Sequence, residues 1–138
     1  MKDVLYYLAS PYSHDCPAIR VARFHQANFA AAILMNFGIL TISPISHSHP
    51  IHLDANGHEL PLDSASFWFW QDWNRVLFDR CDGLIVLTLE GWEDSSGVHM
   101  EQRWAREQKK PIWYVEPSYM SKFARTRAAE LRTKEEEK

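Results

Sequence analysis

The side chain best suited to chemistry in this sequence is Glu101, because it lies on the apolar side of a predicted helix. At about 100° per residue, that side holds Val98, Glu101, Trp104, Ala105 and Gln108. A carboxylate in a half-buried position needs either a partner or a chemical role. The positive end of the helix dipole would keep Glu101 ionised, so that it could act as a nucleophile. The alternative is a structural ion pair with Arg103 or Arg106.

Asp72 is the second candidate carboxyl. It lies inside another predicted helix, with Trp68 and Val76 one turn away on either side. Burial among these side chains would raise the pKa of Asp72, and the resulting carboxylic acid could donate a proton. The alternative is a solvated Asp72 paired with Arg75. Together with Glu101, Asp72 would supply the acid and the nucleophile that retaining glycosidases use.

The segment Asp94-Ser95-Ser96-Gly97 precedes the helix that carries Glu101 and has the composition of an anion site. Free backbone N–H groups, two hydroxyls and a glycine that permits close approach favour a phosphate or a carboxylate. An ordinary serine N-cap is the alternative explanation.

Tyr7 lies at the end of the first predicted strand. From there its hydroxyl could orient a carboxylate, whereas a tyrosine that only fills the core is about equally plausible by position. The sequence leaves both roles open.

Neither a metal ion nor another cofactor is expected. The residues His47, His49, His52 and His58 suggest a metal site, but their segment lacks a supporting helix or strand and has no cysteine or clear carboxylate companion. The P-loop, the Gly-x-Gly-x-x-Gly fingerprint and the Gly-x-Ser-x-Gly elbow are also missing from the sequence. ATP hydrolysis, dinucleotide redox chemistry and the usual serine hydrolase mechanism therefore lose their sequence support.

The elements that must position these residues alternate between strands and helices. Strands are predicted at residues 4–9, 39–42, 83–89 and 111–115, and helices at about 15–38, 63–80, 96–110 and 118–138. Asp15 is expected to cap the first helix, Pro17 to lie in its first turn and Gly38 to end it. Residues 43–62 show no periodicity and are expected to form a long functional or partner-covered loop.

This alternation predicts an α/β fold, a doubly wound, Rossmann- or flavodoxin-like parallel sheet of four to five strands with helices on both faces. Ligands bind such sheets beyond the carboxyl ends of the strands, where the winding reverses. We therefore expect the loop at residues 7–12 to lie beside the loop at residues 91–97.

Length and composition agree with one domain. We assign residues 1–117 to the α/β domain and residues 118–138 to its C-terminal helix and charged tail. The net charge of −3 does not favour binding to a nucleic-acid polymer. No apolar run in the sequence reaches membrane-spanning length. Only Cys16 and Cys81 are present, so a disulfide framework is not expected and the cytoplasm is the simplest compartment.

Three of these motifs together resemble the nucleoside 2-deoxyribosyltransferase-like superfamily, which includes the 2′-deoxynucleoside 5′-monophosphate N-glycosidases. The resemblance extends from Leu5 to about Val115. It rests on Tyr7-Leu8-Ala9-Ser10-Pro11, on Gln71-Asp72-Trp73 and on Ser95-x-Gly97-x-x-x-Glu101.

The resemblance implies a role for each candidate residue. Glu101 would attack the anomeric carbon of the sugar, Asp72 would protonate or hold the departing base, and Tyr7 would orient Glu101. Water or a second base would then release the sugar. The implied substrate-binding residues are Ser10, Pro11, Asp94, Ser95, Ser96, Gly97 and His99.

The implied substrate is a nucleoside or a nucleoside 5′-monophosphate. Ser95 and Ser96 would suit a 5′-phosphate, whereas Asp94 would suit a free 5′-hydroxyl. His99 would narrow the pocket or add a proton donor beside Glu101. The resemblance also implies a homo-oligomer, a dimer or tetramer, in which a neighbour completes the site. The alternatives are a non-catalytic nucleotide-binding or sensing module and a structural oligomer with a vestigial pocket.

Overall fold

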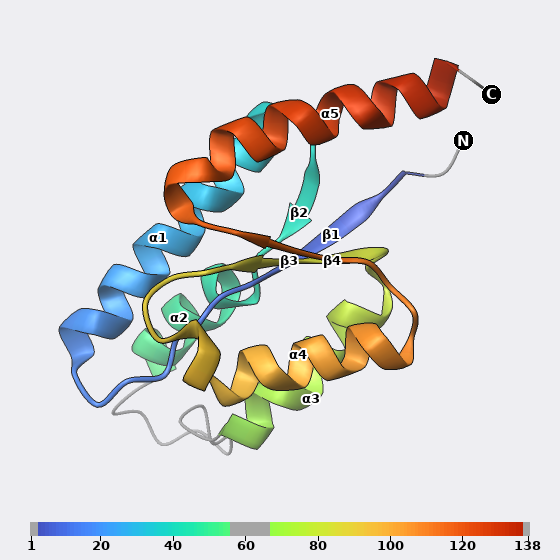
Figure 1. The fold of residues 1–138 in the computed structure, drawn as a ribbon. Helices are drawn as coiled ribbons and strands as arrows, with labels where there is room; N and C mark the ends of the chain where they lie inside the picture. The colour runs from blue at the N-terminus through green and yellow to red at the C-terminus, as the bar shows by residue number, and fades with distance from the viewer. Residues whose placement is uncertain (1–2, 56–66, 137–138) are drawn as a thin grey trace.

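The computed structural model describes residues 3–55 and 67–136 of the chain. Its strands are β1 (Leu5–Ala9), β2 (Leu40–Ile42), β3 (Gly83–Leu87) and β4 (Ile112–Val115). Its helices are α1 (Pro17–Asn36), α2 (Pro44–Ala55), α3 (Phe67–Asp79), α4 (Ser96–Glu107) and α5 (Met120–Glu136), with short 3-10 turns η1 (Trp92–Asp94) and η2 (Pro117–Tyr119). Figure 1 shows their arrangement.

The four strands form one parallel sheet in the order β2-β1-β3-β4. In its register, Leu8 pairs with Ile85, and Ile85 pairs with Trp113. The chain steps from β1 to one side to form β2 and then returns to the other side of β1 to form β3. The winding therefore reverses between β1 and β3, and the predicted doubly wound α/β fold is confirmed.

Helices cover both faces of the sheet (Figure 1). Successive residues of a strand point to opposite faces, so Tyr6 and Leu8 of β1 pack with α1 and α5, whereas Tyr7 and Ala9 pack with α3 and α4. Each face has its own buried cluster. The cluster that contains Tyr7 lies on the side of Glu101.

Helix α1 begins and ends close to its predicted bounds, but its N-cap differs. Cys16 occupies the N-cap position and makes no side-chain capping bond, so the expected cap by Asp15 is wrong. Pro17 lies at the first helical position as predicted, where its missing N–H costs nothing. Gly38 follows the end of the helix with a φ of +80°, a conformation that glycine adopts at little cost.

Residues 44–55 form helix α2, and the loop expected there is wrong. The Ser43 hydroxyl accepts a hydrogen bond from the Ser46 N–H at 3.4 Å, and Pro44 follows at the first helical position. These are signals for a helix start. The buried face of α2 includes Ile45 and His49, so a histidine occupies a position where apolar periodicity would show a hydrophobic residue. The rest of the expected loop, and the start predicted at residue 63 for the next helix, lie outside the described residues.

The predicted inward side of α4 is correct along most of the helix. Val98, Glu101 and Ala105 are buried, and Trp104 is partly buried. Gln108 is exposed, because it is the C-cap residue and its amide donates a hydrogen bond to Asp79 at 2.8 Å. The buried side of α4 therefore ends one turn earlier than expected.

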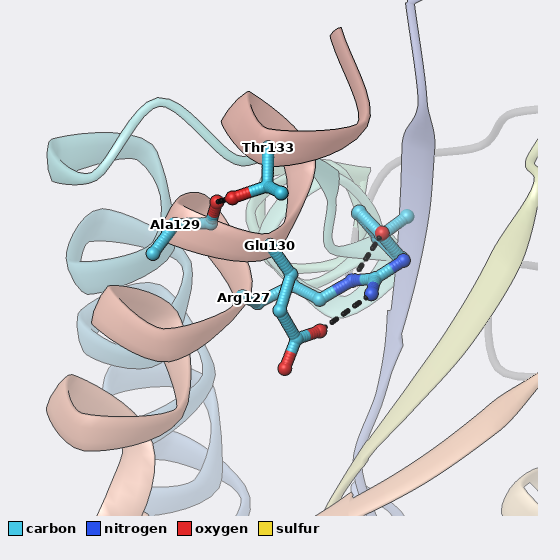
Figure 2. Close-up of polar contacts among 5 residues, drawn as sticks. Arg127, Ala129, Glu130 and Thr133 are labelled. Atoms are coloured by element: carbon cyan, nitrogen blue, oxygen red, sulfur yellow. Dashed lines mark hydrogen bonds and ion pairs between the residues drawn. The ribbon is translucent and has the colours of Figure 1, made fainter. Parts of the chain in front are cut away.

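Helix α5 is tied to the sheet by Arg127. Its Nε donates a hydrogen bond to the Tyr6 hydroxyl at 2.9 Å, and its guanidinium lies 4.8 Å from the centre of the Trp113 ring. Figure 2 shows Arg127 directed toward the sheet. Its Nη1 lies 2.8 Å from Oε2 of Glu130 on the same helix. Within the two described ranges, no helix is long and apolar enough to cross a membrane.

Candidate active site

A cavity of about 920 Å³ opens beyond the carboxyl ends of β1 and β3, where the winding reverses. Ser10 contributes to its lining directly after β1. The connection between β3 and α4 contributes the predicted residues Asp94 and Ser95, and the first turn of α4 contributes Ser96 and Gly97. The predicted meeting of the two loops is confirmed.

Glu101 lines this cavity from the first turns of α4 and is only 5% exposed. Burial raises the pKa of its carboxyl from 4.5 to about 8, although the interaction with Tyr7 opposes the shift. This shift runs against the expectation that the helix dipole keeps Glu101 ionised, because burial penalises the charged carboxylate. In the free protein at neutral pH, Glu101 is mainly a carboxylic acid.

Tyr7 lies behind Glu101 and is fully buried. Burial raises the pKa of Tyr7 well above 10, and the nearby Glu101 carboxyl raises it further. The hydroxyl interacts with Glu101 but forms no hydrogen bond of ordinary geometry with any described residue. Its ring packs edge-on against Phe78 at 5.2 Å. Tyr7 thus both fills the core and faces the candidate nucleophile.

Ser95 is the N-cap of α4, and its hydroxyl accepts a hydrogen bond from the Val98 N–H at 3.3 Å. This is the ordinary structural role that was the alternative to anion binding. Ser95 also lines the cavity, as do the exposed Asp94 and Ser96. The two roles are compatible, since the Ser95 hydroxyl can accept a hydrogen bond from the Val98 N–H and donate one to a ligand.

Gly97 provides open space at the floor of the cavity. A methyl group added to it would lie 3.6 Å from Gln71 Nε2, 3.9 Å from Glu101 Oε1 and 3.9 Å from Ser95 Oγ. Three polar groups from α3, α4 and the preceding loop therefore surround one small volume.

Asp72 does not belong to this site, which corrects the prediction. It is exposed and is not among the lining residues, whereas Gln71 and Asn74 of the same helix are. A helix turns by about 100° per residue, so the side chain that follows Gln71 is carried away from the cavity. The solvated alternative for Asp72 agrees with this exposure.

Two predicted binding residues also lie apart from the cavity lining. Pro11 lies in the loop after β1 and is buried, but it does not line the cavity. His99 is exposed, and its Nε2 contacts the backbone carbonyl of Glu93. Both predictions followed from the family resemblance, and a matching position in the sequence does not determine where a side chain points.

Part of the cavity is lined by residues that the sequence analysis did not assign to it. Tyr12 and Arg20 line it from the β1–α1 connection and α1, and His52 lines it from α2. The Tyr12 hydroxyl shares a hydrogen bond with Nδ1 of the buried His49. Burial raises the pKa of Tyr12, and burial followed by neighbouring positive groups lowers the pKa of His49. In the sequence, Ser43-Pro44 was the signal that could have predicted helix α2 and thus the position of His52.

Arg23 holds the two loops of the site together. Its guanidinium donates hydrogen bonds to the carbonyl oxygens of Ser13 at 2.9 Å and Glu90 at 3.0 Å. Gly91 follows with a φ of +89°, and any side chain there would meet the Arg23 guanidinium. Arg23 therefore connects the segments after β1 and β3.

The histidines do not form a metal site in the described part of the chain. Among residues 3–55 and 67–136, no group of three or more His, Cys, Asp or Glu side chains is arranged to hold a metal ion. His47, His49 and His52 lie on α2, so the expected lack of a supporting helix is wrong. His58 lies outside the described residues.

A family model described as a domain of unknown function (DUF1937) matches residues 4–116. The chain belongs to the DUF1937 family. No curated protein matches it. The DUF1937 description assigns no activity, so the evidence for function comes from the site itself.

Proposed function

We propose that this DUF1937 chain cleaves or transfers the N-glycosidic bond of a nucleoside or nucleoside 5′-monophosphate. The observation that carries the proposal is the position of Glu101. Its carboxyl is buried, lines a cavity at the reversal of the sheet and has the Tyr7 hydroxyl behind it. The resemblance to the nucleoside 2-deoxyribosyltransferase-like superfamily gives the same residue the role of nucleophile.

In the proposed reaction, the ionised Glu101 attacks the anomeric carbon as the bond from that carbon to the base nitrogen breaks. This gives a sugar ester of Glu101 and a free base. Water or a second base then attacks the same carbon and restores the carboxylate. Positive charge develops on the sugar as the bond breaks, and this charge stabilises ionised Glu101. It therefore lowers the pKa of Glu101, whereas burial raises it.

The departing base needs a proton or a hydrogen bond, and the exposed Asp72 lies outside the cavity. His52 lines the cavity from α2. Imidazole is the side chain used most often as a general acid. We assign this role to His52 in place of Asp72.

The test is release of free base from a panel of deoxynucleosides, ribonucleosides and their 5′-monophosphates. We expect turnover by the wild type, a loss of at least about a thousandfold in Glu101→Gln, and near-normal turnover in Asp72→Asn. Asp72→Asn is the matched control, because it removes a carboxylate outside the cavity. Absence of turnover on the whole panel would exclude the proposal.

A second function is favoured by the raised pKa of Glu101, which leaves the carboxyl mainly protonated at neutral pH in the free protein. A nucleotide-binding module without catalysis would tolerate this state. It predicts a ligand-induced rise in melting temperature that persists in Glu101→Gln while no product forms.

Assembly into a homo-oligomer is part of the proposal. Large apolar side chains are exposed on two helices, with Phe29 of α1 70% exposed and Trp73 of α3 60% exposed. Such side chains are common at interfaces. Light scattering coupled to size-exclusion chromatography would test the proposal, and a monomer at all concentrations would contradict it.

A further inference from the structure

Two buried polar atoms in the lining of the cavity have no hydrogen-bond partner among the described residues. They are Ser10 Oγ and Gln71 Oε1, and their residues are 7% and 8% exposed. Buried acceptors are nearly always paired in folded proteins. A ligand in the cavity is a natural source of the missing donors.

Gln71 lies on the face of α3 that borders the cavity. At about 100° per residue, Phe67, Trp70, Gln71 and Asn74 fall on one side of the helix, and all four line the cavity. Two aromatic rings and two carboxamides therefore share one wall. Aromatic rings stack on the faces of nucleobases, and carboxamides form paired hydrogen bonds with their edges.

We propose that Gln71 recognises the hydrogen-bonding edge of the substrate's base. Gln71 Oε1 accepts a hydrogen bond from an N–H of the base, and the carboxamide nitrogen donates to a neighbouring acceptor, while Phe67 and Trp70 contact the ring. The bases that fit carry an N–H donor beside an acceptor. The inference rests on the proposed function for the ligand being a nucleoside.

The position of Gln71 relative to Glu101 agrees with this role. Gln71 Nε2 and Glu101 Oε1 both lie within 4 Å of the point where a methyl group on Gly97 would be. A base held by Gln71 would thus have its sugar close to the Glu101 carboxyl. A carboxamide has no ionisable proton to give, so Gln71 selects the base and is not the acid of the reaction.

The test compares dissociation constants for two matched pairs of ligands, measured by isothermal titration calorimetry with Glu101→Gln added to the wild type and to each variant so that no ligand is cleaved during the titration. One pair is 2′-deoxyadenosine and purine 2′-deoxyriboside, which lacks the exocyclic amine. The other is 2′-deoxyinosine and 1-methyl-2′-deoxyinosine, which lacks the ring N–H. We expect the wild type to bind the donor-bearing member of at least one pair about tenfold more tightly. In Gln71→Leu that preference should fall to about onefold, and in the control Asp72→Asn it should persist.

Thermal unfolding of the free variants separates recognition from a structural role. Gln71→Leu replaces a carboxamide whose Oε1 has no hydrogen-bond partner among the described residues with an apolar side chain of similar size, so its melting temperature should equal or exceed that of the wild type. A lower melting temperature would indicate a structural role and contradict the inference. Gln71→Met provides a second apolar variant for the same binding comparison.

Equal binding of both members of each pair by the wild type would overturn the inference, as would an unchanged preference in Gln71→Leu. Base release without such a preference would overturn this inference and leave the proposed glycosidase intact. If the protein releases no base but shows a preference that depends on Gln71, base recognition would be supported and the catalytic proposal would be excluded.

Discussion

The Tyr7 hydroxyl and the Glu101 carboxyl face each other in the buried layer beneath the cavity, and each changes the pKa of the other. Burial is the largest cause for both groups. Tyr7 favours the ionised form of Glu101, whereas Glu101 favours the protonated form of Tyr7. Burial, which Tyr7 partly offsets, therefore brings the pKa of Glu101 close to neutral pH.

Activity should rise with pH if ionised Glu101 is the nucleophile. Because the pKa of Glu101 in the free protein is about 8, kcat/KM for base release should increase up to about tenfold per pH unit below pH 8 and level off above it. Tyr7→Phe removes an interaction that lowers this pKa, so the plateau should move to higher pH. An unchanged profile in Tyr7→Phe would contradict the coupling.

The stability of the free protein should fall as the pH rises. The folded state binds the Glu101 proton more tightly than the unfolded state does, since its pKa is about 8 instead of 4.5. The resulting stabilisation is fully present below about pH 4.5 and is lost up to pH 8, by at most about 1.4 kcal/mol per pH unit. Denaturant unfolding of Glu101→Gln should lack this loss. The control Glu107→Gln, at an exposed position on the same helix, should behave like the wild type.

Gly97→Ala should separate activity from folding. The added methyl group would make only ordinary contacts, the nearest at 3.6 Å, and alanine favours a helix over glycine by up to about 1 kcal/mol. The melting temperature should therefore stay the same or rise. Base release should fall at least about tenfold, because the methyl group occupies the floor between Gln71 and Glu101. Normal activity in this variant would place the substrate elsewhere.

Gly83→Ala is the contrasting variant. Its methyl group would lie 3.0 Å from the Trp113 ring and 3.2 Å from the Tyr6 ring, on the side of the sheet away from the cavity. Overpacking of this kind typically costs about 1–3 kcal/mol of unfolding free energy. Stability should fall while the Michaelis constant of the remaining folded enzyme is unchanged. A changed Michaelis constant would show that the two faces of the sheet are coupled.

Arg20→Met should reveal whether the substrate carries a phosphate. Arg20 lines the cavity and donates a hydrogen bond to the backbone carbonyl of His14. If its charge binds a 5′-phosphate, the Michaelis constant for the monophosphate should rise about tenfold and that for the nucleoside should change little. An equal loss for both substrates would instead assign Arg20 to support of the loop after β1.

Much of the fold follows from the sequence, because its signals are local. Alternating apolar strands and helices predict a parallel sheet, and the right-handed crossovers of such sheets leave few topologies. Those rules also brought Ser10 and the segment from Asp94 to Gly97 to one edge of the sheet. The position of Glu101 followed from the period of its own helix, where polar and apolar residues are clearly separated.

Three properties of the site were decided only by tertiary structure. Helix α3 also carries large apolar side chains on its exposed side, Trp68, Trp73 and Val76. Its sequence pattern therefore could not show that Gln71 borders the cavity and Asp72 faces solvent. Helix α2 buries His49 where a hydrophobic residue would have revealed its inner face. The pKa of Glu101 depends on how much water the packed elements exclude, which its own helix does not determine. The sequence determined which residues could do chemistry, whereas packing between distant segments determined which of them share the cavity and in what state of charge.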